Sequence, residues 1–312
     1  MLLGRTAQGL YWMNRYVERA ENMARLLETG LRMSLTSTAG TDEWGSVLMS
    51  AAADSAYKAK HGAYEEEKVV DFILRDPDNA SSVMAALDSA RNNGRMVRTA
   101  LTRDTWESLN EAWLATRTML GRKVERRDLP KVLSGIKRET ALFRGAYYNT
   151  QLRNEIFDFC QLGTYIERAD NTARILDVKY YVLLPSVSWV GSSLDNYQWE
   201  SILRSVSAHR SYRFVYEAQY RPQNIADFLI LNVRMPRSLA FCVRFIEESL
   251  AFRAADYGAR HACHQTLDAM KAKLAVASVR DIIDVGLHEF LAGIIVDNNK
   301  LGAEIAEAYR FA

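Results

Sequence analysis

The 312-residue chain has few residues that interrupt regular structure. It contains five prolines and sixteen glycines, too few for long irregular stretches. Clean alternation of apolar and polar residues is missing, and so are the Asn-Gly and Asp-Gly turns of β-hairpins. Almost every long segment instead repeats its apolar residues at helical spacing. The sequence therefore predicts an all-α fold.

Signals for export, membranes and polyanions are also missing. The N-terminal stretch lacks the apolar core of a signal peptide, and no run reaches the roughly 18–20 apolar residues of a membrane span. The three cysteines, Cys160, Cys242 and Cys263, are far apart, as expected for reduced thiols. A net charge of +2 gives no general attraction to nucleic acid or anionic lipid. We expect a cytoplasmic protein with neither nucleic acid nor membrane as a partner.

The motifs of common catalytic sites are missing too. The chain has no P-loop, no G-x-G-x-x-G, no H-E-x-x-H and no G-x-S-x-G. A di-iron bundle would need Glu-x-x-His motifs, and none occurs. His261, Cys263 and His264 lack a visible fourth ligand, and Cys160 has no nearby histidine to activate it. We therefore predict no cofactor and no metal site, and a buried thiol at Cys160.

The most specific feature that is present is a segment that occurs twice. Residues 16–28 read YVERAENMARLLE, and residues 165–177 read YIERADNTARILD. WGSVLMSAA at Trp44 resembles WESILRSVSA at Trp199. Together with a third match further along the chain, these matches occur in the same order in both copies, which indicates an internal duplication.

The third match is DFILRDPDNASSV with DFLILNVRMPRSL, and it aligns Ser82 with Ser238. The duplication predicts two tandem helical bundle halves, residues 1–149 and 150–312, packed about a pseudo-twofold axis into one compact domain. Each half is expected to contain about five helices. The last third of each half no longer matches visibly.

Helix boundaries follow from the periodicity, the caps and the breakers. The spacing predicts a first helix over Thr6–Thr36 and a long helical region through the second motif, broken near Asn149 or Gly163. Asn79 or Ser81 is expected to cap the helix that follows Pro77.

On a helical wheel, each repeated segment is apolar over about half of its circumference, which is typical of a helix packed on several sides. Small residues such as Ala20 would let a neighbouring helix approach closely. A narrow polar stripe remains in each copy, and an arginine lies at the edge of each apolar face. These candidate residues are Glu18, Arg19, Asn22 and Arg25 in the first copy, and Glu167, Arg168, Asn171 and Arg174 in the second.

Two interpretations of the stripes stay open at this level. Glu21–Arg25 and Asp170–Arg174 are i,i+4 pairs in the favourable order, which leaves the first glutamate of each copy without a local partner. In one interpretation the two helices exchange ion pairs, such as Glu18 with Arg174 and Glu167 with Arg25. In the other, the stripes line a cleft between the halves and bind a charged substrate.

A second group of arginines is a weaker candidate. Arg91, Arg95 and Arg98 recur at helical spacing, and Arg237 lies in the Pro-Arg-Ser segment of the second half. Such a basic run is more often a solvated helix face than an anion site. Asn92 and Asn93 would add amide donors, so an anion-binding role stays a hypothesis.

The quoted segments resemble the bacterial Alpha-E family, named for an all-helical domain with an E-R motif. WMNRYVERAENMARLL resembles the family's N-terminal signature, LGTYIERADNTARILD its second block, and ARNNGRMVR with TRDTWESLN its middle block. The resemblance covers nearly the whole chain. Arg-Asn-Asn at 91–93 replaces a more usual Arg-Glu-Asn, so no glutamate role is carried over to position 92.

The resemblance implies a function through gene context. Alpha-E proteins are typically encoded beside circularly permuted ATP-grasp proteins and transglutaminase-like proteins. This implies a non-catalytic helical partner or scaffold in an ATP-grasp-dependent system that forms peptide or amide bonds or modifies peptides, with an ATP-grasp protein as partner and a peptide or charged small molecule as ligand. The alternative is an enzyme, an amide-bond transferase or hydrolase, that uses the paired Glu and Arg residues in a cleft between the halves.

Overall fold

A computed structural model describes residues 2–35, 43–181, 192–217 and 220–311. These residues form α-helices and no β-strand, which confirms the predicted all-α class. The α-helices are α1 (Gly4–Ser34), α2 (Glu43–Ser50), α3 (Asp54–His61), α4 (Glu66–Leu74), α5 (Val83–Met96), α6 (Arg103–Met119), α7 (Leu129–Thr150), α8 (Glu155–Tyr181), α9 (Ser193–Ser205), α10 (His209–Tyr216), α11 (Pro222–Ala226), α12 (Leu239–Tyr257), α13 (Ala262–Val276), α14 (Val279–Val285) and α15 (Leu287–Ala308). A 3-10 turn, η1 (Arg98–Ala100), follows α5, and a π-helical turn, η3 (Asp227–Leu231), follows α11.

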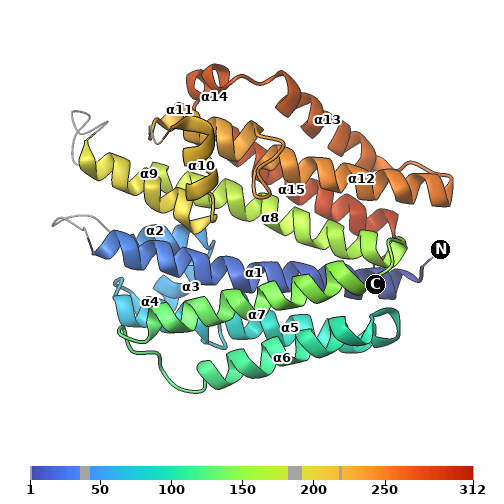
Figure 1. Cartoon of the computed structure of the whole chain (residues 1–312), viewed down its shortest axis with the longest axis horizontal. Helices are drawn as coiled ribbons and strands as arrows, with labels where there is room; N and C mark the ends of the chain where they lie inside the picture. Colours follow the sequence, from blue (N-terminus) through green and yellow to red (C-terminus); the bar gives the residue numbers. More distant parts are fainter. Residues whose placement is uncertain (1, 36–42, 182–191, 218–219, 312) are drawn as a thin grey trace.

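Two long helices, α1 and α8, lie side by side at the centre of the molecule (Figure 1). Helix α1 packs against α5 and α7 on one side, and α8 packs against α12 and α15 on the other. Helices α6 and α13 form the outer layers, α6 against α5 and α7, and α13 against α12 and α15. The two copies of the repeated motif therefore lie against each other in the middle of the fold.

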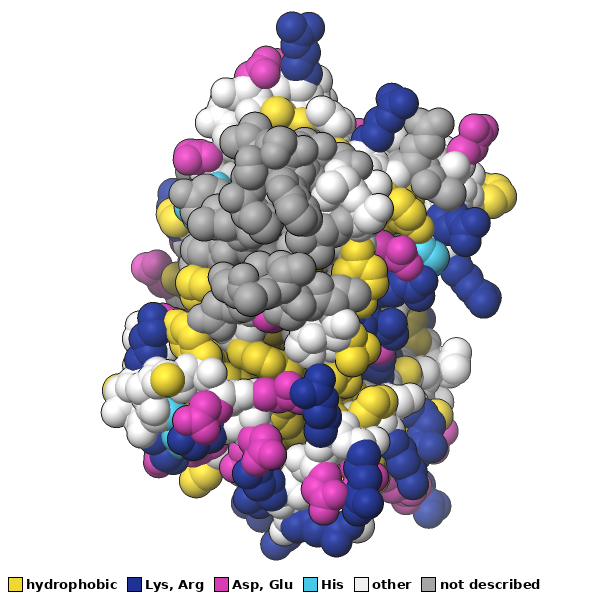
Figure 2. Space-filling model, turned by 90° about the vertical axis from the view of Figure 1, so that its left-hand side faces the viewer, with side chains coloured by type: hydrophobic (Ala, Val, Ile, Leu, Met, Phe, Trp, Pro, Cys, Tyr) yellow, Lys and Arg dark blue, Asp and Glu magenta, His cyan; other side chains and the backbone are white. Residues whose placement is uncertain are grey.

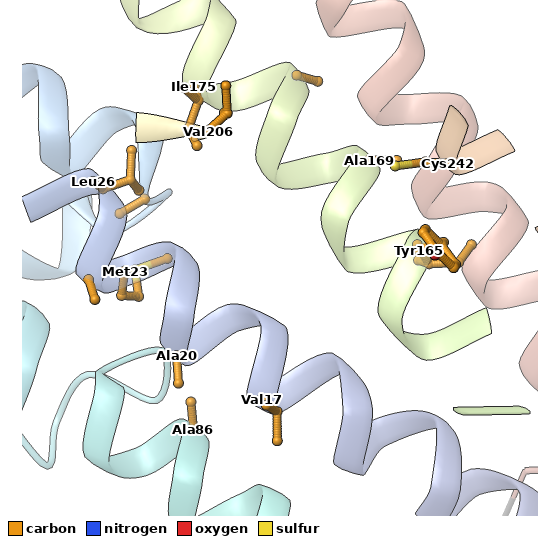
Figure 3. Close-up of a cluster of buried hydrophobic side chains, with 14 of the residues drawn as sticks. Val17, Ala20, Met23, Leu26, Ala86, Tyr165, Ala169, Ile175, Val206 and Cys242 are labelled. Carbon is orange, nitrogen blue, oxygen red and sulfur yellow. The ribbon is translucent and has the colours of Figure 1, made fainter. Parts of the chain in front are cut away.

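Small side chains allow the close packing of these central helices. Figure 3 shows Ala20 of α1 facing Ala86 of α5, and Ala169 of α8 facing Cys242 of α12. All four are at most 1% exposed. Because such side chains project little from the helix surface, neighbouring backbones can approach each other. The close approach predicted at Ala20 is confirmed.

The crossing of α1 and α8 is especially tight at Gly163. A Cβ atom at this position would lie 2.1 Å from the backbone oxygen of Tyr11. Gly163 is thus inside α8 and not at a break, and the prediction of a break there is wrong. The alternative, near Asn149, is confirmed within a few residues, because α7 ends at Thr150 and α8 begins at Glu155.

Two other boundary predictions needed adjustment. Helix α1 begins at Gly4, two residues before the predicted Thr6, and the predicted end at Thr36 lies outside the described residues. The cap of α5 is Ser82 rather than Asn79 or Ser81: its hydroxyl accepts a hydrogen bond from the backbone amide of Ala85. Asn79 instead accepts from the amide of Ser81 within the preceding turn.

The outer surface carries charge of both signs. On the face drawn in Figure 2, lysines and arginines are interspersed with aspartates and glutamates over the lower part of the molecule. None of the described helices combines the length and low charge that crossing a membrane requires.

Candidate functional site

The repeated glutamate-arginine dipeptides pair with each other across the α1–α8 interface. Arg168 donates two hydrogen bonds to Glu18, from Nε to Oε1 at 2.9 Å and from Nη2 to Oε2 at 3.0 Å. Arg19 does the same with Glu167, at 2.6 and 3.0 Å. The glutamate of each dipeptide therefore accepts two hydrogen bonds from the arginine of the other dipeptide. This bidentate arrangement is the strongest common geometry for such a pair.

This exchange corrects the predicted partners. We expected Glu18 to meet Arg174 and Glu167 to meet Arg25. Those two arginines instead bond the acid one turn earlier on their own helix, Arg25 to Glu21 and Arg174 to Asp170, as the i,i+4 spacing predicted. The arginine directly after each glutamate lies at the edge of the apolar face, which is the edge turned toward the other helix.

The first copy is buried more deeply and is surrounded by more arginines. Arg237, from the turn before α12, donates to Glu18 and to Glu21, both at 2.8 Å. Arg144 of α7 contacts the same two carboxylates. Both carboxylates are at most 1% exposed. Four arginines thus surround two carboxylates.

This arrangement fixes the protonation states of the two carboxylates. Burial alone would raise the pKa of Glu18, but Arg168, Arg237 and Arg144 outweigh it and hold that pKa well below its usual range. In the same way, burial opposes and the neighbouring arginines lower the pKa of Glu21, to about 2. Both groups are carboxylates at neutral pH, and neither has a proton to give.

Burial and a neighbouring arginine both act on Arg237. Burial lowers its pKa, and the nearby Arg25 guanidinium lowers it further, so that the pKa is about 10 despite Glu18 and Glu21. Arg25 uses a further nitrogen to donate to the Ser205 carbonyl at 3.0 Å, at the end of α9. The network therefore joins both central helices to segments from the second part of the chain.

The second copy is closer to solvent. Glu167 accepts from Arg15 at 2.8 Å as well as from Arg19, and these two arginine side chains are 14% and 21% exposed. Burial would raise the pKa of Glu167, but the two arginines lower it below its usual value. Its environment has the same character as that of Glu18 with fewer arginines.

The two asparagines of the stripes are buried as well. Asn22 is 1% exposed and Asn171 is 3% exposed. Within the described part of the chain, neither amide atom of Asn22 has a hydrogen-bond partner, and the Asn171 nitrogen has none. These two asparagines are thus enclosed between helices.

The structure does not assemble the predicted anion-binding arginines into one group. Arg91 donates to Asn110 at 2.7 Å and lies over the Trp113 ring, while Arg95 and Arg98 are exposed on the surface of α5 and η1. Arg237 instead belongs to the buried network around Glu18.

The thiols are buried, as predicted for Cys160. All three cysteines are fully buried, and burial raises the pKa of each thiol. Among the described residues, no group of three or more His, Cys, Asp or Glu side chains is placed to hold a metal ion.

Two pockets open beside the network, along one face of α8. The first, which we call the arginine pocket, has a volume of about 360 Å³ and is lined by Arg144, Gly145, Tyr147, Tyr148, Thr164, Tyr165 and Arg168. The second, the acidic pocket, has a volume of about 530 Å³ and is lined by residues of α7, α8 and α12 with the link between α7 and α8. Tyr148 lines both pockets.

Sequence reasoning missed several residues of this region. Arg144 and Arg15 join the network from outside the repeated motif. In the acidic pocket, Arg253 is 2% exposed and donates to the buried Asp158. Burial raises the pKa of Asp158 to about 6, although Arg253 opposes the shift. The sequence indicates this region only through the spacing of Asp158 and Arg168, which lie ten residues apart and therefore near the same face of a helix.

Comparison with known proteins gives one match. The model of a family called Alpha-E, described as a predicted alpha-helical domain with a conserved ER motif, matches residues 2–309. No curated protein and no solved structure matches the chain. The two E-R dipeptides of this sequence, Glu18-Arg19 and Glu167-Arg168, are the ones that exchange partners between α1 and α8.

Proposed function

The chain belongs to the Alpha-E family, and from that premise we propose that it is a non-catalytic helical scaffold in a cytoplasmic, ATP-grasp-dependent system that forms peptide or amide bonds or modifies peptides. In this proposal an ATP-grasp protein activates the substrate, and this chain docks that protein or presents a peptide to it. The gene context of the family suggests the partner. The buried glutamate-arginine network supports the non-catalytic role.

The state of the two motif glutamates carries this proposal. Glu18 and Glu167 are each held by a bidentate arginine and at least one further arginine, and both are at most 2% exposed. A general acid or base needs a pKa near the working pH and access to the reacting atom. Glutamates with lowered pKa values, enclosed between helices, satisfy neither requirement. Their geometry suits structural ion pairs that fix the register of α1 against α8.

We also propose that the scaffold arose by duplication, with halves 1–149 and 150–312 related by a pseudo-twofold axis. The reciprocal exchange between the two E-R dipeptides supports this. So do the caps of α5 and α12, because Ser82 and Ser238 are aligned in the two halves and each accepts a hydrogen bond from the backbone amide three residues later. The Ala20–Ala86 and Ala169–Cys242 contacts are a further equivalent pair.

Co-purification tests the partner. The tagged chain is expressed in its native cell together with an ATP-grasp protein of the same cell, and the complex is isolated with and without ATP. We expect the two proteins to elute together and the turnover of the ATP-grasp protein to depend on this chain. A chain that elutes alone under every nucleotide condition, with a fully active ATP-grasp protein, would refute the scaffold role.

A Glu18→Gln, Glu167→Gln double variant separates the scaffold from the enzyme alternative. Both substitutions keep the side-chain volume and remove only the charge. The scaffold predicts a lower thermal unfolding midpoint, with any loss of partner activity following the loss of folded protein. A variant that keeps the wild-type midpoint and abolishes turnover by the purified chain would instead establish an enzyme.

A further inference from the structure

The arginine pocket and the acidic pocket follow one face of helix α8. Asp158, Gln161, Tyr165 and Arg168 are spaced by three, four and three residues, which places them within about 80° of each other around the helix. The first two line the acidic pocket and the last two line the arginine pocket. The two pockets share Tyr148 in their linings, and we call them together the α8 groove, with α7 along one side and α12 along the acidic part.

A chain of hydrogen bonds joins the two pockets along the floor of the groove. The Gln161 amide nitrogen donates to the Tyr148 hydroxyl at 2.6 Å, and the Tyr148 and Tyr165 hydroxyls are 3.2 Å apart. Gln161 is only 3% exposed, yet its side-chain oxygen has no partner among the described residues. If the amide is turned over, its nitrogen is left without a partner instead. A buried amide with one open position costs free energy.

The acidic pocket carries a surplus of negative charge. Arg253 is already bonded to Asp158 and Asp256. Arg153 lies against the Phe157 ring, 3.8 Å from its centroid, and donates to a backbone carbonyl. Glu248 lines the same pocket and pairs with no arginine or lysine in the described part of the chain. The lining therefore holds three carboxylates, on Asp158, Glu248 and Asp256, against the two guanidinium groups of Arg153 and Arg253.

Aromatic side chains make this end of the groove partly apolar. Phe245 and Phe252 line the acidic pocket from α12, and Phe252 is 54% exposed. Phe245 also stacks on Tyr165, with ring centroids 4.8 Å apart. A ligand that brings a cation to Glu248 can place an apolar group against these rings.

The opposite end offers positive charge. Arg144 and Arg168 line the arginine pocket, and they belong to the network in which four arginines surround two carboxylates. Arg168 is fully engaged with Glu18 and with a backbone carbonyl. Arg144 is bonded to both carboxylates through one nitrogen, Nη1, and its side chain is 22% exposed. It can direct its other nitrogens toward an anion in the pocket.

We propose that the α8 groove binds a short peptide with free ends, its amino group at Glu248 and Asp158 and its carboxylate at Arg144. Ten residues separate Asp158 from Arg168, which is about 15 Å along a helix. An extended peptide spans about 3.3–3.6 Å per residue. The two charged ends of the groove therefore match a peptide of about four residues, with an apolar first side chain against Phe245 and Phe252.

This inference deepens the proposed function, because it names the ligand that the scaffold would present. Its test needs only the purified chain and a peptide, whereas the test of the scaffold role needs the ATP-grasp protein and no peptide. Each idea can therefore fail alone. The probe is the tetrapeptide Phe-Ala-Ala-Ala, titrated by calorimetry in its free form, in its N-acetylated form and in its C-amidated form. We expect each blocked form to bind about tenfold more weakly or worse, because a charge-assisted contact is lost.

Two variants locate the site. Glu248→Gln should weaken the free peptide and leave the N-acetylated peptide unchanged, with Glu111→Gln, on the surface of α6, as its charge-matched control. Gly145→Phe should abolish binding of all three forms by filling the arginine pocket. A Cβ at Gly145 meets no atom within 4 Å, and replacing a helical glycine favours the helix, so thermal stability should be kept. Ala141→Phe adds the same ring one turn earlier on α7, outside the pocket, and should bind normally.

Several results would overturn the inference. These are no binding of the free peptide at millimolar concentration, equal binding of the free and blocked peptides, or undiminished binding by Gly145→Phe.

Discussion

Replacing Glu18 by glutamine should destabilise the fold more than the same change at Glu167. Glutamine keeps the volume and removes the negative charge. At position 18 this leaves Arg168 without its two carboxylate bonds, and the side chain of Arg168 is only 10% exposed. Breaking a buried pair by removing one partner costs about 3–5 kcal/mol. We expect Glu18→Gln to fall in this range.

The environment of Glu167 reduces the loss in the free energy of unfolding that the same substitution causes there. Its partners Arg15 and Arg19 are 14% and 21% exposed, so water can solvate them once the carboxylate is gone. The loss should then be close to that of charged hydrogen bonds near a surface, about 1.5–3 kcal/mol. The two glutamates occupy matching places in the sequence, so the difference between the variants measures what the tertiary structure adds.

Equilibrium unfolding in urea, followed by circular dichroism at 222 nm, measures both losses. Glu111→Gln removes one exposed negative charge from α6 and should change the free energy of unfolding by less than about 0.5 kcal/mol. A second measurement combines Glu18→Gln with Arg168→Met, and the double variant should lose less than the sum of the single variants. The reasoning is refuted if Glu18→Gln unfolds at the wild-type urea midpoint, or if Glu167→Gln costs more.

The pKa of the Glu21 carboxyl is about 2 in the fold and about 4.3 in the unfolded chain. Glu21 therefore contributes about 3 kcal/mol to the free energy of unfolding above the unfolded pKa, and this contribution is lost as the pH falls from about 5 to 2. A urea midpoint that does not change between pH 7 and pH 3 would contradict this. Gly163→Ala places a methyl group 2.1 Å from a backbone oxygen of α1 and should lower the free energy of unfolding by about 1–3 kcal/mol. A Cβ at Gly145 meets no atom within 4 Å, so Gly145→Ala should raise the thermal unfolding midpoint. The opposite order of stability would show that the crossing of α1 and α8 is not tight. Ser82→Ala and Ser238→Ala should each cost about 1 kcal/mol by thermal unfolding, because each hydroxyl caps a helix, and a neutral result at either would remove its capping role.

Much of the fold was predictable because it depends on local signals. The helical class follows from the apolar spacing, the scarcity of proline and the missing strand signals, which act over a few neighbouring residues. Glu21–Arg25 and Asp170–Arg174 were predictable for the same reason, since i,i+4 partners are fixed by the helix itself. The cap of α5 was misplaced by one residue, because three candidate side chains, Asn79, Ser81 and Ser82, lie close together.

The partners of the motif glutamates were not predictable from the sequence. Arg168 and Arg174 both lie on α8, and the sequence offers either as a partner for Glu18. The angle and offset at which α1 packs against α8 bring Arg168 to Glu18. Arg144 and Arg237 reach Glu18 from segments 126 and 219 residues away along the chain. Their distances depend on how α7 and the turn before α12 pack on α1.

The sequence by itself determined that this chain folds into helices, that two of them carry the same acid, amide and arginine pattern, and that the chain resembles the Alpha-E family. It determined these because periodicity, motif and local pairing are properties of a single stretch of chain. Only the tertiary structure decided that the E-R dipeptides exchange partners, that four arginines gather around two carboxylates, and that a groove with oppositely charged ends lies beside them. Burial and ion pairing between distant segments depend on positions in space, and the packing of α1 against α8 sets those positions.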